Sequence, residues 1–72
     1  MGGLSIMKKQ EIEDLKPGDI IFCPFTYQKW LVNFWKNDDK NKLDILIVQN
    51  IKENYQWFLT KEQLKRYIKI KE

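Results

Sequence analysis

The sequence predicts a single, mostly β domain of five short strands, with a short helical segment near the N-terminus and a one-turn helix before the last strand. Short runs in which apolar and polar residues alternate are typical of half-buried strands. Clusters of Asn, Asp, Gly and Pro lie between these runs and supply the turns. The predicted strands are 20–23, 29–36, 43–49 and 55–59, with a short closing strand around Ile68 and Ile70.

Local signals define the first elements. Ile12 and Leu15 lie three residues apart, which gives residues 8–15 one apolar edge and predicts a short helix. Residues 16–19, Lys-Pro-Gly-Asp, predict a type II turn, because Pro fixes φ and the following Gly accepts a positive φ. Pro24 cannot donate to a ladder, which places it at the end of the first strand, at a bulge or on an edge.

The later connections are polar. Residues 37–42 predict a hairpin connection and residues 50–54 the next turn. Thr60 and Gln63 have the spacing of a capping box, which starts one helical turn. Residues 64–71 fit a helix or a strand. We favour an edge strand, because β-branched isoleucines alternate there with lysines.

Composition argues against catalysis. The 72 residues include 13 Lys or Arg and 10 Asp or Glu, a formal charge of +3, and no His. The usual general base and the commonest metal ligand are therefore missing, and no phosphate-binding glycine pattern occurs. Asp38 and Asp39 are adjacent, but in a polar turn both are expected to stay solvated. We expect no enzyme activity, no cofactor and no metal site.

Residues 1–72 are expected to form one domain, with 1–16 as an N-terminal extension. Met7 is a candidate natural start, which would make the preceding residues an added leader, and the sequence leaves this open. The single cysteine, Cys23, closes no internal disulfide and suits a reducing compartment. No apolar run approaches the roughly 18 residues of a membrane span. A cytoplasmic protein without membrane contact is expected.

Residues 15–21, Leu-Lys-Pro-Gly-Asp-Ile-Ile, resemble the Gly-Asp strand entry of Src-homology-3-like (SH3-like) small barrels. The order of a four-strand meander, a helical turn and a closing strand over residues 15–71 is similar to theirs. The resemblance implies a five-stranded barrel. The acidic loop and tryptophan pair that hold proline-rich peptides have no match here, and we find no catalytic set like that of the ribonuclease toxins that share this entry. The resemblance therefore implies the fold alone.

Polar residues within the strands indicate which side chains face outward: Asn33, Asp44 and Gln56 mark the outward sets of strands two, three and four. Together the apolar members of these sets would form a larger patch than a monomer usually leaves exposed, so we expect a protein-binding surface there. It comprises Leu31, Trp35, Leu46, Val48 and Phe58. The inward set, expected to fill a small barrel, comprises Trp30, Val32, Phe34, Leu43, Ile45, Ile47, Tyr55, Trp57 and Leu59.

Three alternatives stay open for that surface. The N-terminal segment is one candidate cover, as a helix lying on a sheet, through Leu4, Ile6, Ile12 and Leu15. A symmetric homodimer is another. A one-residue bulge would exchange the two sets and make Trp30, Phe34 and Trp57 the outer aromatic residues.

Two functions are weighed. The first is a non-catalytic protein-binding module, an adaptor or stoichiometric inhibitor, with Trp35 and Phe58 as anchors. Its size and its Lys, Asn and Ile content fit phage or mobile-element accessory proteins that act on a host machine. The alternative is sequence-nonspecific nucleic-acid binding by lysines and stacking aromatic rings, although a single arginine argues against base readout. The residues of this alternative are Tyr27, Lys29, Trp30, Lys36, Lys65, Arg66 and Lys69.

Overall fold

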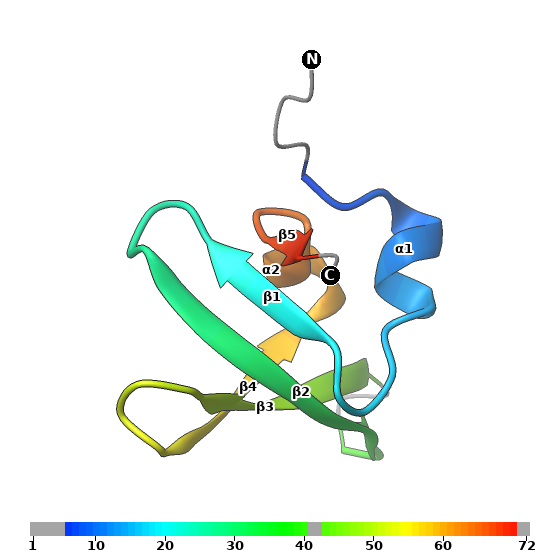
Figure 1. Ribbon diagram of the computed structural model, residues 1–72. Coiled ribbons are helices and arrows are strands. Elements are labelled where there is room, and N and C mark those ends of the chain that lie inside the picture. The colour runs from blue at the N-terminus through cyan, green and yellow to red at the C-terminus, as the bar shows by residue number, and fades with distance from the viewer. Residues whose placement is uncertain (1–5, 41–42, 71–72) are drawn as a thin grey trace.

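The computed structural model describes residues 6–40 and 43–70, which form five strands and two short helices (Figure 1). The elements are α1 Lys9–Glu13, β1 Ile20–Cys23, β2 Gln28–Asp38, β3 Leu43–Asn50, β4 Gln56–Thr60, α2 Lys61–Leu64 and β5 Ile68–Ile70. All five predicted strands are confirmed. The short β5 also decides between helix and strand for residues 68–70.

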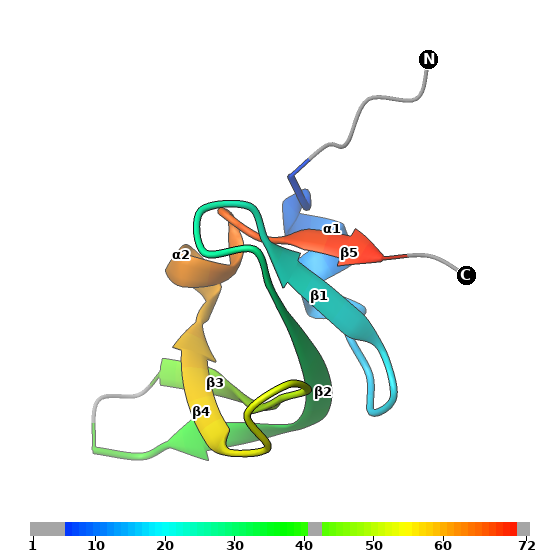
Figure 2. The same ribbon diagram turned by 60° about the vertical axis from the view of Figure 1, so that its left-hand side comes forward.

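The strands form one antiparallel sheet in the order β4-β3-β2-β1-β5. β2 bends along its length, so that β1 and β5 lie across from β3 and β4 (Figure 2). Within the described residues β4 and β5 do not pair with each other, and β5, with three residues, pairs only with β1. The mostly β prediction is therefore confirmed, whereas the sheet is not closed into the expected barrel.

The two turn signals of the sequence are confirmed. Gly18 has a φ of 97°, and the Asp19 N–H donates to the Lys16 carbonyl over 3.1 Å, as the predicted turn requires. At the start of α2, Thr60 Oγ1 accepts from the Gln63 N–H over 3.2 Å. The Gln63 Oε1 in turn accepts from the Thr60 N–H over 2.9 Å, which completes the capping box.

A β-bulge interrupts β2 at Asn33. Val32 lies opposite Val48, but the next paired residue, Phe34, lies opposite Ile47, so the register shifts between Val32 and Phe34. A bulge places two residues of one strand opposite one residue of its partner and changes the phase of the alternation. Trp35 consequently lies opposite buried Leu46, on the inner face of the sheet.

Much of the expected face assignment is wrong, on β2 because of the bulge and on β3 because Asp44 marked the wrong set. Leu46 and Val48, expected outside, are 0% exposed, and Trp35 packs against the core. Four residues expected inside are exposed by 44–53%: Phe34, Leu43, Tyr55 and Trp57. Ile45 and Ile47, also expected inside, lie half-buried on the outer face with Phe34. Only three members of the expected inward set are buried: Trp30, Val32 and Leu59.

Asp44 was a misleading marker. It lies on the same face of β3 as Leu46, because alternate residues of a strand share a face. Its carboxylate lies at the start of the strand, where Lys61 Nζ approaches its Oδ2 to 3.6 Å. A charged residue at the end of a strand can therefore face inward without being buried.

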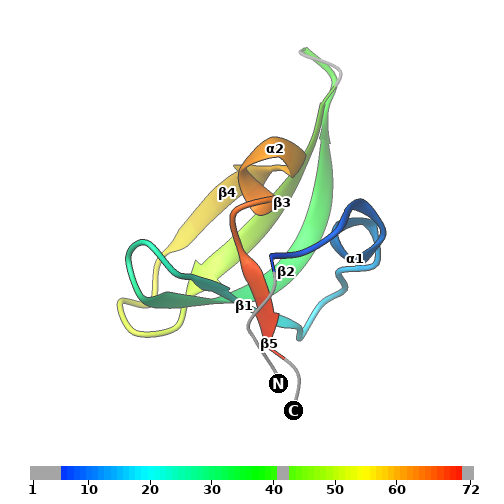
Figure 3. The ribbon, with the colours of Figure 1, turned by 90° about the horizontal axis from the view of Figure 1, so that it is seen from above.

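The N-terminal segment covers the inner face. Ile12 and Leu15 belong to one buried cluster with Leu46, and the Trp35 indole N–H donates to the Leu15 carbonyl over 3.0 Å. Ile6 is 58% exposed, and Leu4 lies outside the described residues. Ile12 and Leu15 therefore cover Trp35 and Leu46 of the expected surface, but on the inner face of the sheet, and Phe58 stays 50% exposed. The N-terminal segment leaves β4 uncovered, since α1 and β4 lie on opposite sides of the molecule (Figure 3).

We predict that Leu46→Ala lowers the free energy of unfolding by roughly 2–5 kcal/mol, because a fully buried leucine leaves a cavity. Leu43→Ala, at a side chain that is 51% exposed on the same strand, is the matched control and should cost less than about 1 kcal/mol. Urea unfolding of both variants measures the difference. Equal losses would show that the inner face has been assigned wrongly.

Candidate functional site

Three apolar side chains form a row across the outer face of the sheet. Phe34 on β2 lies opposite Ile47 on β3, and Ile47 lies opposite Phe58 on β4. Phe34 and Phe58 are each 50% exposed, and Ile47 is half-buried between them. Side chains directly opposite each other in antiparallel strands are in contact range, so Phe34, Ile47 and Phe58 are continuous. We call these three residues the outer apolar row.

The second exposed feature is the free edge of β4. Among the described strands β4 pairs with β3 alone, and its sequence, Gln-Trp-Phe-Leu-Thr, has no charge, Pro or Gly. Natural sheet edges are usually blunted by such residues or by short length. The other edge, β5, has both devices: it has three residues, and Lys69 at its centre lies 3.6 Å from Asp19.

The hydrogen-bond pattern shows which backbone groups of β4 are open. The Asn50 N–H donates to the Tyr55 carbonyl over 2.7 Å, so 50 and 55 form a hydrogen-bonded pair. Such pairs alternate along an antiparallel ladder. The N–H and C=O of Trp57 therefore point towards β3, and those of Gln56 and Phe58 point away from β3. Thr60 has the same orientation, but its N–H donates to Gln63.

Two of the five residues expected in a protein-binding surface lie on the outer face. Phe58 belongs to the outer apolar row, and Leu31 lies half-buried on the same side of β2. The other three, Trp35, Leu46 and Val48, face the core. The sequence assignment missed Phe34 and Ile47 because it placed them inside; the bulge alternative was the signal that pointed to Phe34.

The residues expected to bind nucleic acid do not form one basic surface. Lys65 lies 2.9 Å from Glu62, and Lys69 is paired with Asp19. Lys29 and Lys36 are both exposed, but they lie roughly 20 Å apart along β2 at about 3.3 Å per residue. Arg66 is also exposed. Of the two aromatic candidates, Tyr27 is 80% exposed and Trp30 only 6%.

A small aromatic cavity lies between β2, β4 and the residue before β5. Its volume is about 180 Å³, and it is lined by Thr26, Gln28, Trp30, Tyr55, Trp57 and Tyr67. The Trp30 and Tyr55 rings meet edge to face, with 5.5 Å between their centroids. No charged side chain lines the cavity, so it offers flat apolar surface and no counter-ion.

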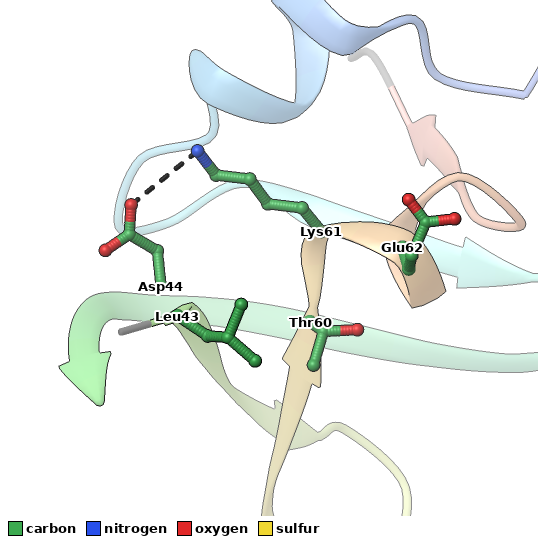
Figure 4. A pocket seen from close by; sticks show the side chains of 5 residues that line it. All are labelled: Leu43, Asp44, Thr60, Lys61 and Glu62. Atoms are coloured by element: carbon green, nitrogen blue, oxygen red, sulfur yellow. Dashed lines mark ion pairs between the residues drawn. The ribbon is translucent and has the colours of Figure 1, made fainter. Parts of the chain in front are cut away.

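A larger hollow of about 380 Å³ lies where β3 begins and α2 starts (Figure 4). Lys61 reaches across it to Asp44, and the same ammonium lies 5.7 Å from the centre of the Trp35 ring. Both charges are therefore engaged within the chain. This hollow joins α2 to β3 and provides no free group for a ligand.

Cys23 is the one thiol and is 6% exposed. Burial raises the pKa of its thiol, but hydrogen bonds from the Thr26 side chain, the Thr26 and Phe25 backbone and the Tyr67 hydroxyl outweigh this and lower it. The pKa of Tyr67 is raised to about 12 by burial and by the neighbouring Cys23. Tyr67 therefore stays a hydrogen-bond donor, and the thiol lies almost out of reach of solvent.

The fold and these surfaces define a small antiparallel β domain with one apolar row and one open edge. Within residues 6–40 and 43–70, no group of three His, Cys, Asp or Glu side chains is placed to hold a metal ion. No described helix is long and apolar enough to cross a membrane. No protein-family model, curated protein or solved structure matches the chain.

We predict that Tyr67→Phe raises the pKa of the Cys23 thiol, because it removes a hydrogen bond that favours the thiolate. The ultraviolet absorbance of the thiolate, titrated against Cys23→Ser as a blank, should then rise at higher pH than in the parent chain. Tyr27→Phe removes a tyrosine that is 80% exposed and should leave the midpoint unchanged. The same midpoint in all three proteins would refute the assigned contact.

Proposed function

We propose that this chain is a non-catalytic protein-binding module whose contact surface is the outer apolar row. The alignment of Phe34, Ile47 and Phe58 across three strands, with both phenylalanines 50% exposed, carries this proposal. Contiguous exposed apolar side chains on a small domain favour a contact surface, and aromatic anchors usually supply most of the binding energy.

An adaptor or a stoichiometric inhibitor acts by occupying a partner's surface, so it needs a shaped apolar face and no reacting group. The proposal includes a cytoplasmic location, supported by the single reduced Cys23, and an origin among phage or mobile-element accessory proteins, supported by size and composition. It also includes an SH3-like architecture of the fold, supported by the strand order and by α2 between β4 and β5.

Charge replacement within the row is the direct test. We predict that Phe34→Lys weakens capture of the protein partner from source-cell lysate by at least about tenfold, because a charge replaces an aromatic anchor of an apolar contact. Phe25→Lys introduces the same charge at a side chain that is 75% exposed in the β1–β2 turn, and it should bind like the parent. Quantitative immobilised-chain binding with nuclease-treated lysate measures both.

Equal capture by the two variants would contradict the proposed surface. Capture that disappears after nuclease treatment, or that falls steeply between low and moderate salt, would instead identify a nucleic-acid ligand. Circular dichroism of both variants establishes that each remains folded, which is expected because both replaced side chains are at least half exposed.

A further inference from the structure

We propose that a second copy of this chain binds the open edge of β4, in an antiparallel register whose two-fold axis passes beside Trp57. This inference uses the backbone of β4 and does not depend on the identity of any foreign partner. The alternation of the ladder directs four backbone groups of this edge away from β3, the N–H and C=O of Gln56 and Phe58, on a strand without a charged residue. Such an edge is a template for another strand.

The available donors and acceptors select the register. With the axis beside Trp57, Gln56 of one copy lies opposite Phe58 of the other, and the symmetric pair forms as well. About four interchain hydrogen bonds then use every open group of Gln56 and Phe58. With the axis beside Phe58, Gln56 would instead lie opposite Thr60, whose N–H already donates to Gln63.

The charges that flank the strand fit the same axis. Lys52 and Glu53 precede β4 in the exposed turn, and Lys61 and Glu62 follow it in α2. In this register the turn with Lys52 and Glu53 approaches the start of α2, with Lys61 and Glu62, in the second copy. Lys61 already lies 3.6 Å from Asp44 and Glu62 2.9 Å from Lys65, so the approaching charges would extend existing ion pairs of alternating sign. A foreign strand would need to carry this order independently, whereas a second copy carries it by symmetry.

The side chains at the axis also suit burial. Trp57 is 53% exposed and stacks on Phe58, with 5.6 Å between ring centroids. In the dimer Trp57 of one chain lies directly opposite Trp57 of the other, and such aromatic cross-strand pairs are favourable. Two five-residue strands bury less than the roughly 1,200 Å² of a standard stable interface. The dimer is therefore weak and depends on concentration.

Sedimentation velocity from about 1 µM to about 1 mM tests the association. The expected result is a mass that rises from 8.8 kDa towards twice that value. Trp57→Lys places like charges opposite each other at the axis and should weaken self-association at least tenfold, while Phe34→Lys, away from the edge, should leave it unchanged. A single mass of one chain at every concentration would overturn the proposal.

Disulfide trapping tests the register in a Cys23→Ala background. With a copper–phenanthroline oxidant, Trp57→Cys should cross-link the two copies, because directly opposite residues have Cβ atoms about 4.5–5.5 Å apart. In Phe58→Cys the two introduced cysteines would be diagonal neighbours about 7–8 Å apart, so this variant should cross-link much more slowly. Faster cross-linking by Phe58→Cys would overturn the register.

The two proposals fail separately. If Phe34→Lys loses partner capture and the parent chain is monomeric, the outer apolar row is kept as the proposed contact surface and the dimer is rejected. The opposite result is also distinct. If Trp57→Lys dissociates the dimer and Phe34→Lys changes neither the dimer nor partner capture, the proposed dimer is retained. The outer apolar row is then rejected as the surface that contacts a foreign partner.

Discussion

The bulge at Asn33 is the constraint on which the rest of the structure depends. It lets one strand of 11 residues supply Val32 to the core on one side of the bulge and Trp35 on the other. Trp35 then reaches the Leu15 carbonyl, which ties the N-terminal segment to the sheet. The same change of phase turns Phe34 outward. The buried core and the outer apolar row are thus two consequences of one extra residue, since bulges both re-aim side chains and bend strands.

Closure of the inner face leaves the molecule asymmetric. Met7, Ile12 and Leu15 cover the inner face of the sheet, where the buried side chains of β2 and β3 meet. Nothing among the described residues pairs with the free side of β4. In a domain this small the chain has few residues with which to cover a second face, because the surface-to-volume ratio is unfavourable. The outer face and the β4 edge are therefore the surfaces left for other molecules.

Sequence reasoning succeeded where the signal and its partner are close in the chain. The turn at Gly18 and the capping box of Thr60 each involve residues no more than three apart, so the pattern alone contains the interaction. It failed where the partner is remote: the bulge exists only in the pairing of β2 with β3, and the inward-facing Asp44 meets Lys61, which is distant in the sequence. Phe58 was assigned correctly because Gln56, the polar residue that marks its set, does lie on the outer face of β4.

Phe58 belongs to both exposed surfaces, since its side chain completes the outer apolar row while its backbone lies on the open edge of β4. In the proposed dimer the two Phe58 side chains are diagonal neighbours, so the rows of the two copies meet across the axis. A partner would then contact one apolar band that is twice as long as either row. Phosphates would find no continuous basic surface, because Lys65 and Lys69 are paired with carboxylates and the exposed Lys29 and Lys36 lie far apart along β2. This geometry supports the proposed protein partner, one with an extended apolar face.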